Sequence, residues 1–413
     1  MLSSDLRKFS KGRLVIDCTN FLGFYIKHRG VSGIQRVILC LLQVLQNDKN
    51  VIFAFHDGYD YKELLLCPDA PILRQLEVFA KRRVSFKSPL ARRGLAKKIE
   101  GFVKLLLRRH ARISRTLDPR DGDTFFFPDA GWANPDALSY VRVLKEKLVV
   151  RLAVYVYDLI PYYGESFVDF GSFVAFKNYV EGVIELADQI ICISDFTRRD
   201  LDLFSGGCSA SVITLAHEFG LFNLDQFTSK EAKERIIRLG VDDPVHTRPF
   251  ALCVGTIDRR KNQVSLVRAW IALSHRRVMP LLVLAGRYGS MSDDVRILIE
   301  REKYAIKVIE NPSDEDIGSL YYACQFTVFP SYYEGWGLPV GESLWFGKPC
   351  LASNATAIPE VGGQHCRYFD PSSMDDLIGK LEGMLDNPPD LSNMDRGQLR
   401  TWDQVTADLL HAL

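Results

Sequence analysis

Short apolar runs alternate along this chain with longer segments in which apolar residues recur at helical spacing. Parallel strands joined by crossover helices produce this alternation, so the pattern predicts an α/β fold. In the first half we expect strands at 14–18, 51–55, 124–127, 148–156, 189–193 and 211–215, and helices at 34–46, 173–186 and 195–204.

The same alternation of apolar runs and helix-like segments begins again at residue 250 and predicts a second nucleotide-fold-like domain. Its strands are expected at 250–254, 281–285, 306–309, 326–329 and 349–353. A length of 413 residues also exceeds what one hydrophobic core usually serves. We therefore predict Rossmann-like domains at 1–245 and 246–398. Between them lie a polar helix-like run at 229–240 and the proline-containing segment 242–249, which suits a linker or an exposed connection. The segment 399–413 has the spacing of an amphipathic helix.

The amino-acid composition argues against several functional classes of protein. Hydrophobic residues make up 47% of the chain and charged residues 25%, as in globular proteins. The net charge of +1 argues against a nucleic-acid binder. Nine scattered cysteines, mostly within apolar runs, indicate reduced thiols. Since neither a signal peptide nor an apolar stretch of about 18 residues is found, we expect a cytoplasmic protein that does not span a membrane.

The segment 329–349 carries the most chemical information. A strand ends near Phe329, a glycine-containing loop follows, and Pro339 marks the start of a helix. Glu334 is expected on the loop and Glu342 in the first helical turn. Loops at the carboxyl ends of parallel strands line ligand sites, and carboxylates bind sugar hydroxyls well. The loop amides expected to bind the same ligand belong to Gly335, Trp336, Gly337 and Leu338. The alternative is a capping Glu342 with a surface Glu334.

A second constellation lies in 254–270. A glycine turn at Gly255 leads to Arg260 and Lys261, and Asn262 is a suitable N-cap for the helix that follows. Cations beside a helix N-terminus favour an anion, so a diphosphate is expected here. A solvated basic turn is the alternative.

The chain resembles the retaining glycosyltransferases of family four, which have the GT-B fold of two Rossmann-like domains facing each other across a cleft. The glutamate pair and VGTIDRRKN match that family's signature motifs. Further similar segments are ISDFTRRDL (193–201), LAGRYG (284–289), IPEVGG (358–363) and YFDP (368–371).

The resemblance implies roles for these residues. Arg260 and Lys261 would neutralise the diphosphate of a nucleotide sugar, Glu342 would hold its ribose, and Glu334 with the amides of 335–337 would bind the transferred sugar. Arg260, Lys261 and Glu334 form the expected catalytic set. In retaining transfer of this class the leaving diphosphate oxygen takes the acceptor proton, so neither a dedicated base nor a cofactor is expected.

Two features of the first half resemble family features less closely. Gly33 enters an apolar helix and would let backbone amides approach the donor phosphates; a simple turn is the alternative. Asp158 ends a strand and is a candidate for orienting the acceptor, or it caps a turn. Family members carry histidine where Tyr157 stands.

No metal site is expected. Asp121 and Asp123 form the carboxylate pair that metal-using sugar transferases employ, but a turn entering the strand 124–127 explains them more simply. The histidines show no zinc-ligand spacing.

The segment 81–115 contains thirteen Lys and Arg residues and a single acid, Glu100. Apolar residues recur within it at helical spacing, which is typical of a helix on an anionic membrane surface. A solvated helix packed on the domain is the alternative. The membrane interpretation predicts peripheral attachment to the inner face of the cytoplasmic membrane.

These observations and the resemblance predict transfer of a hexose to a saccharide acceptor. The resemblance further implies mannose from GDP-mannose as the favoured donor, and a saccharide or lipid-linked saccharide acceptor in polysaccharide or O-antigen biosynthesis. An epimerase or phosphorylase on the same fold is an alternative, although no lysine site for pyridoxal phosphate is evident. A non-catalytic GT-B scaffold or regulatory partner is another, and Tyr157 is the feature that favours it.

Overall fold

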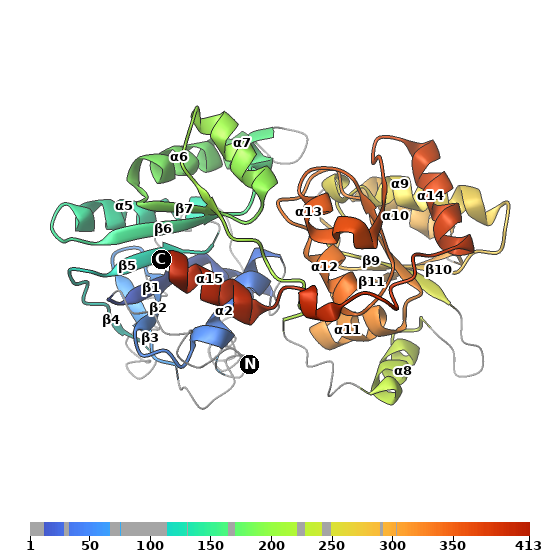
Figure 1. Ribbon diagram of the computed structural model, residues 1–413, viewed down its shortest axis with the longest axis horizontal. Helices are drawn as coiled ribbons and strands as arrows, with labels where there is room; N and C mark the ends of the chain where they lie inside the picture. The colour runs from blue at the N-terminus through green and yellow to red at the C-terminus, as the bar shows by residue number, and fades with distance from the viewer. Residues whose placement is uncertain are drawn as a thin grey trace, which may run out of the picture. The chain divides into compact units, whose positions relative to one another are not determined.

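Two compact units make up the chain (Figure 1). The computed structural model describes residues 12–28, 33–66, 75, 114–129, 131–163, 170–220, 228–241, 249–289, 292–302 and 304–413. The first unit comprises Met1–Ile193, Arg198–Ile213 and Trp402–Leu413, and the second comprises Ser194–Thr197 and Thr214–Thr401.

The first unit is built on a sheet whose described strands lie in the order β4-β3-β2-β1-β5-β6-β7-β8. From β2 to β8 the neighbouring strands are parallel, whereas β3 and β4 add an antiparallel edge. The strands are β1 (Leu14–Asp17), β2 (Val51–His56), β3 (Tyr61–Leu64), β4 (Ser114–Thr116), β5 (Thr124–Phe127), β6 (Arg151–Val156), β7 (Gln189–Cys192) and β8 (Ser211–Val212).

Helices connect the parallel strands of this unit. They are α1 (Thr19–His28), α2 (Ile34–Leu45), α5 (Pro135–Lys145), α6 (Phe170–Leu186) and α7 (Asp195–Ser205), which begins in the second unit. The last helix, α15 (Trp402–Ala412), belongs to the first unit and packs against α2 (Figure 1). Its buried residues include Trp402, Val405 and Leu409, the spacing that marks an amphipathic helix.

The second unit contains a parallel sheet in the order β11-β10-β9-β12-β13-β14. Its strands are β9 (Phe250–Val254), β10 (Leu281–Ala285), β11 (Ile306–Ile309), β12 (Phe326–Phe329), β13 (Cys350–Ser353) and β14 (Cys366–Phe369). Its helices are α8 (Ser229–Arg238), α9 (Gln263–Ser274), α10 (Asp293–Arg301), α11 (Asp314–Ala323), α12 (Leu338–Trp345), α13 (Ile358–Gly362) and α14 (Met374–Asp386). Two separate apolar clusters, one with Trp270 and one with Tyr321, pack against the sheet, as in a Rossmann-like domain.

The helix-like run expected at 229–240 forms helix α8 of the second unit. Residues 242–248 of the expected connection lie outside the described residues. Ala232 and Ile236 are buried, and α8 packs on α11. Arg238 also forms an ion pair with Asp316 of α11 at 2.6 Å. The second unit accordingly takes in the chain from Thr214, whereas the sequence placed the boundary near residue 245.

The α/β class with two Rossmann-like domains is confirmed. Several strands agree residue for residue with their expected ranges: 124–127, 250–254, 281–285, 306–309 and 326–329. The antiparallel strands β3 and β4 were not anticipated. Among the described helices, none is both long and apolar enough to span a bilayer.

Candidate functional site

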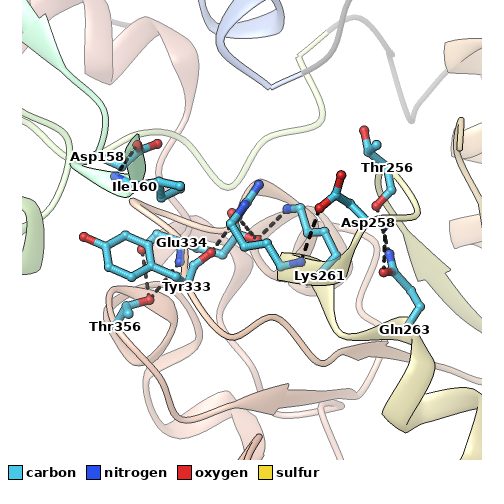
Figure 2. Close-up of polar contacts among 10 residues, drawn as sticks. Asp158, Ile160, Thr256, Asp258, Lys261, Gln263, Tyr333, Glu334 and Thr356 are labelled. Atoms are coloured by element: carbon cyan, nitrogen blue, oxygen red, sulfur yellow. Dashed lines mark hydrogen bonds and ion pairs between the residues drawn. The ribbon is translucent and has the colours of Figure 1, made fainter. Parts of the chain in front are cut away.

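Arg260 and Lys261 converge on one oxygen of Glu334, and Figure 2 shows Lys261 beside Glu334. Lys261 Nζ lies 2.5 Å from Glu334 Oε1, and Arg260 Nη1 lies 2.9 Å from the same atom. Arg260 also donates to the carbonyl oxygen of Tyr333 at 2.5 Å. The cations follow β9 and the glutamate follows β12, and these strands are neighbours in the sheet. The sheet therefore joins the two constellations that the sequence showed separately.

The charges in this cluster set the protonation states of Glu334 and Lys261. Burial alone would raise the pKa of Glu334, but the charges of Arg260 and Lys261 outweigh it and lower that pKa to about 2. Burial lowers the pKa of Lys261, and the Glu334 carboxylate partly offsets this. With Glu334 ionised, two cations against one carboxylate leave one positive charge, which suits an anionic ligand.

The turn before α9 differs from the expected one. Arg259–Lys261 forms a short 3₁₀ helix, and the Asp258 side chain accepts a hydrogen bond from the Arg260 amide at its start. Asn262 occupies the N-cap position of α9 in a left-handed conformation, but its side chain makes no capping bond. It donates instead to the carbonyl oxygen of Pro371 at 3.3 Å. The N-cap position was right, whereas the capping bond expected of Asn262 is absent.

Gly255 follows β9 directly and has a φ of 143°, and its amide donates to the carbonyl oxygen of Ala285 in β10 at 3.0 Å. A Cβ on Gly286, the residue after β10, would lie 2.0 Å from the Gly255 carbonyl oxygen. These glycines allow a close approach of two backbones at the carboxyl edge of the sheet.

The loop before α12 presents backbone donors. Gly337 is the N-cap with a φ of 115°, and the helix begins at Leu338 with Pro339 in its first turn. In the part of the chain that the structure describes, the amides of Gly335, Trp336 and Gly337 have no acceptor. The Trp336 side chain is buried, which fixes the loop. These amides at a helix N-terminus can bind hydroxyls or an anion.

Glu342 lies in the second turn of α12, so its expected place in the first turn is wrong. Its side chain is buried, and Oε2 accepts a hydrogen bond from the Tyr321 hydroxyl at 2.9 Å. Glu334 is buried as well. Both facts contradict the alternative of a capping Glu342 and a surface Glu334.

Sequence reasoning missed Thr356. Its Oγ1 accepts from the Glu334 amide at 2.9 Å and donates to the Glu334 carbonyl at 3.0 Å, so one side chain holds both backbone groups (Figure 2). Its φ of 55° is rare for a β-branched residue. Such a backbone outlier at a candidate site indicates a positioning role that no sequence motif revealed.

The first-unit candidates have local explanations. Gly33 is the N-cap of α2 with a φ of 48°. Asp158 Oδ1 accepts from the Ile160 amide at 3.0 Å, as the turn-capping alternative expects. Tyr157 is buried and donates to the carbonyl oxygen of Pro128 at 2.7 Å, so it acts in packing where the family carries histidine. The phosphate role of Gly33 and the acceptor role of Asp158 remain predictions.

The Asp121 and Asp123 pair shapes a turn. Asp121 accepts from the Val149 amide at 2.7 Å, and Asp123 forms an ion pair with Arg13 at 2.6 Å. Of the basic segment 81–115, the structure describes only residues 114 and 115, in β4. The membrane helix predicted there lies outside the described residues.

Residues 241–398 match the family described as glycosyl transferases group 1. The match lies within the second unit. The matched residues include Arg260, Lys261, Glu334 and Glu342, and the resemblance stated from those motifs is confirmed.

Among characterised relatives, the chain resembles O-antigen mannosyltransferases. It is 37% identical to O-antigen chain mannosyltransferase B of Escherichia coli over 32% of this chain and 35% of that one. It is 28% identical to the serotype-specific mannosyltransferase WbdA of Escherichia coli over 55% of this chain and 28% of that one. The matches thus span about a third of the relatives' length.

Solved structures support the fold. HepE of Anabaena, in complex with UDP-glucose, superposes with a TM-score of 0.64 at 13% identity, over 97% of this chain and all of that one. Sucrose-phosphate synthase of Thermosynechococcus elongatus superposes with a TM-score of 0.58 at 18% identity, over 97% of this chain and 94% of that one. The GT-B class expected from the sequence is therefore confirmed.

Proposed function

We propose that this chain transfers a hexose from a nucleotide diphosphate sugar to an acceptor with retention of configuration. The observation that carries the proposal is the convergence of Arg260, Lys261 and Glu334 at the carboxyl edge of a parallel sheet. Ligands bind at this edge in open α/β sheets.

Different groups of the site have different roles in the transfer. As the glycosidic bond breaks, negative charge grows on the leaving diphosphate, and Arg260 and Lys261 stabilise it from fixed positions. The amides of Gly335–Gly337 and the carboxylate of Glu334 bind hydroxyls of the transferred sugar. No metal is needed in this scheme because the protein itself supplies the cations.

Mannose is the favoured sugar, with GDP-mannose as donor. The support is the likeness to two Escherichia coli mannosyltransferases, one of them at 37% identity. HepE, whose structure contains UDP-glucose, is only 13% identical, so its donor carries less weight. The same likeness to O-antigen enzymes favours a saccharide or lipid-linked saccharide acceptor at the cytoplasmic membrane.

The proposal is tested by following nucleotide release from GDP-mannose, UDP-glucose and related donors, with lipid-linked acceptors present. Lys261→Ala is expected to lower turnover about a hundredfold, since one fixed charge at the developing anion is lost. EDTA is expected to leave the rate unchanged.

Arg259→Ala is the matched control. Arg259 belongs to the same 3₁₀ helix, but the cations that contact Glu334 are the two residues that follow it, Arg260 and Lys261. Equal turnover in wild type and Lys261→Ala would contradict the site assignment. Donor binding without turnover of any donor would favour the scaffold alternative.

A further inference from the structure

The buried carboxylate of Glu342 is held by a residue from a different helix. Tyr321 lies on α11 and donates its hydroxyl proton toward Glu342 Oε2 at 2.9 Å. Tyr321 is 0% exposed and Glu342 is 4% exposed. A hydrogen bond between two buried groups is costly to lose, because water cannot replace the missing partner.

The ring of Tyr321 has little freedom to move. It stacks on Phe346 with ring centroids 5.3 Å apart and an interplanar angle of 16°. Phe219 packs edge-on against it at 6.0 Å. The hydroxyl also lies 3.3 Å from the carbonyl oxygen of Pro339, so its direction toward α12 is determined by two acceptors. The aromatic cluster thus orients the donor before any ligand binds.

The bond has a consequence for the carboxylate. A carboxylate accepts about four hydrogen bonds in fixed directions, and occupying Oε2 sets where the remaining lone pairs point. Glu342 lies in the second turn of α12, and ion pairs hold Glu334 on the loop before that helix. The two glutamates are therefore positioned by independent means.

We infer that Tyr321 is a positioning residue that orients Glu342 to accept the ribose hydroxyls of the donor nucleotide. This inference rests on the proposed function and adds a residue that the sequence motifs do not contain. Removing the hydroxyl would leave the diphosphate contacts of Arg260 and Lys261 in place. The loss should therefore appear only with ligands that carry ribose hydroxyls.

Calorimetric titration tests this inference with GDP and UDP and with their 2′,3′-dideoxy counterparts. We expect the wild type to bind one of the two nucleotides, GDP or UDP, about tenfold more tightly than the dideoxy form of the same nucleotide. In Tyr321→Phe this ratio is expected to fall close to one, while the affinity for the dideoxy form stays unchanged. A purely structural role would weaken both ligands equally.

Tyr322→Phe on the same helix is the control, because Tyr322 is 40% exposed and is expected to retain the wild-type ratio. Should melting show that Tyr321→Phe does not fold, Phe346→Leu replaces it, since this change loosens the stacked ring and keeps the hydroxyl. A wild-type ratio in the folded variant would overturn the inference. If the wild type bound a nucleotide and its dideoxy form equally well, the inference would be overturned but the proposed function would stand. If the wild type bound neither GDP nor UDP, the proposed function itself would be overturned.

Discussion

At the scale of single residues, Glu334 competes with the proposed substrate. Its Oε1 occupies both Arg260 and Lys261, the cations that a donor diphosphate would require. An incoming diphosphate carries more negative charge than one carboxylate and would draw the cations toward itself. Glu334 would then be released toward the sugar hydroxyls, so donor binding and sugar recognition are expected to be coupled.

Thr356 should matter for activity through its hydroxyl. Thr356→Ala removes both hydrogen bonds to the Glu334 backbone, so the carboxylate loses its fixed position, and turnover is expected to fall about tenfold. Thr356→Ser keeps the hydroxyl and is expected to retain most of the activity. Steady-state nucleotide release compares the two variants. Equal losses in both would show that the methyl group, and not the hydroxyl, is what matters.

Asp17 should make the first unit less stable as the pH rises. Burial raises the pKa of Asp17 to about 6, despite the opposing hydrogen bonds from Thr19. The folded state therefore binds this proton more tightly than the unfolded chain. Stability is lost as the pH rises from about 4 to about 6, and the full cost of about 3 kcal/mol persists above that range.

Asp17→Asn removes this titration and can still accept the Thr19 bonds through Oδ1. Urea midpoints at several pH values are expected to show a gain over wild type that grows from pH 4 to pH 6 and then levels off. Asp118→Asn, at an exposed position, serves as the control. A gain that is equal at pH 4 and pH 7 would be inconsistent with a raised pKa.

At the scale of elements, the site depends on how α12 begins. Gly337 has a φ of 115°, and a Cβ there would lie 3.4 Å from the Phe329 ring. Gly337→Ala is expected to cost about 1–2 kcal/mol in unfolding free energy and to shift the loop amides. Gly379→Ala in α14 is the matched change, because a Cβ there meets nothing within 4 Å.

Thermal melting compares the two glycine variants. Gly337→Ala is expected to lower the melting temperature, whereas Gly379→Ala is expected to leave it unchanged or raise it. Alanine in a helix interior is favoured over glycine by up to about 1 kcal/mol, so Gly379→Ala should be neutral or stabilising. If Gly337→Ala melted at or above the wild-type temperature, the left-handed start of α12 would not be required.

At the scale of the whole molecule, the last helix contributes to the core of the first unit. Leu409 of α15 is fully buried and α15 packs on α2, so Leu409→Ala is expected to destabilise that unit by about 2–5 kcal/mol. His411→Ala on the exposed face of α15 should change stability by less than about 0.5 kcal/mol. Urea unfolding followed by circular dichroism measures both. Similar midpoints in the two variants would contradict the packing of α15.

The fold class, most strand positions and the residue types of the site were predictable from the amino-acid sequence. Strands such as 250–254 and 281–285 were predictable because apolar runs and turn residues act locally. Arg260 and Lys261 could be assigned to an anion because the strand, turn and helix around them are contiguous in the chain.

Which groups from distant parts of the chain come into contact depends on strand pairing and packing, and the sequence pattern does not reveal it. Lys261 and Glu334 are 73 residues apart in sequence and come together because β9 and β12 pair. β3 and β4 form an antiparallel edge through pairing partners about fifty residues apart, such as Glu63 and Arg115, which local periodicity cannot reveal. Tyr321 holds the Glu342 side chain through one hydrogen bond, and Thr356 holds the Glu334 backbone through two. No local sequence pattern encodes contacts of that kind.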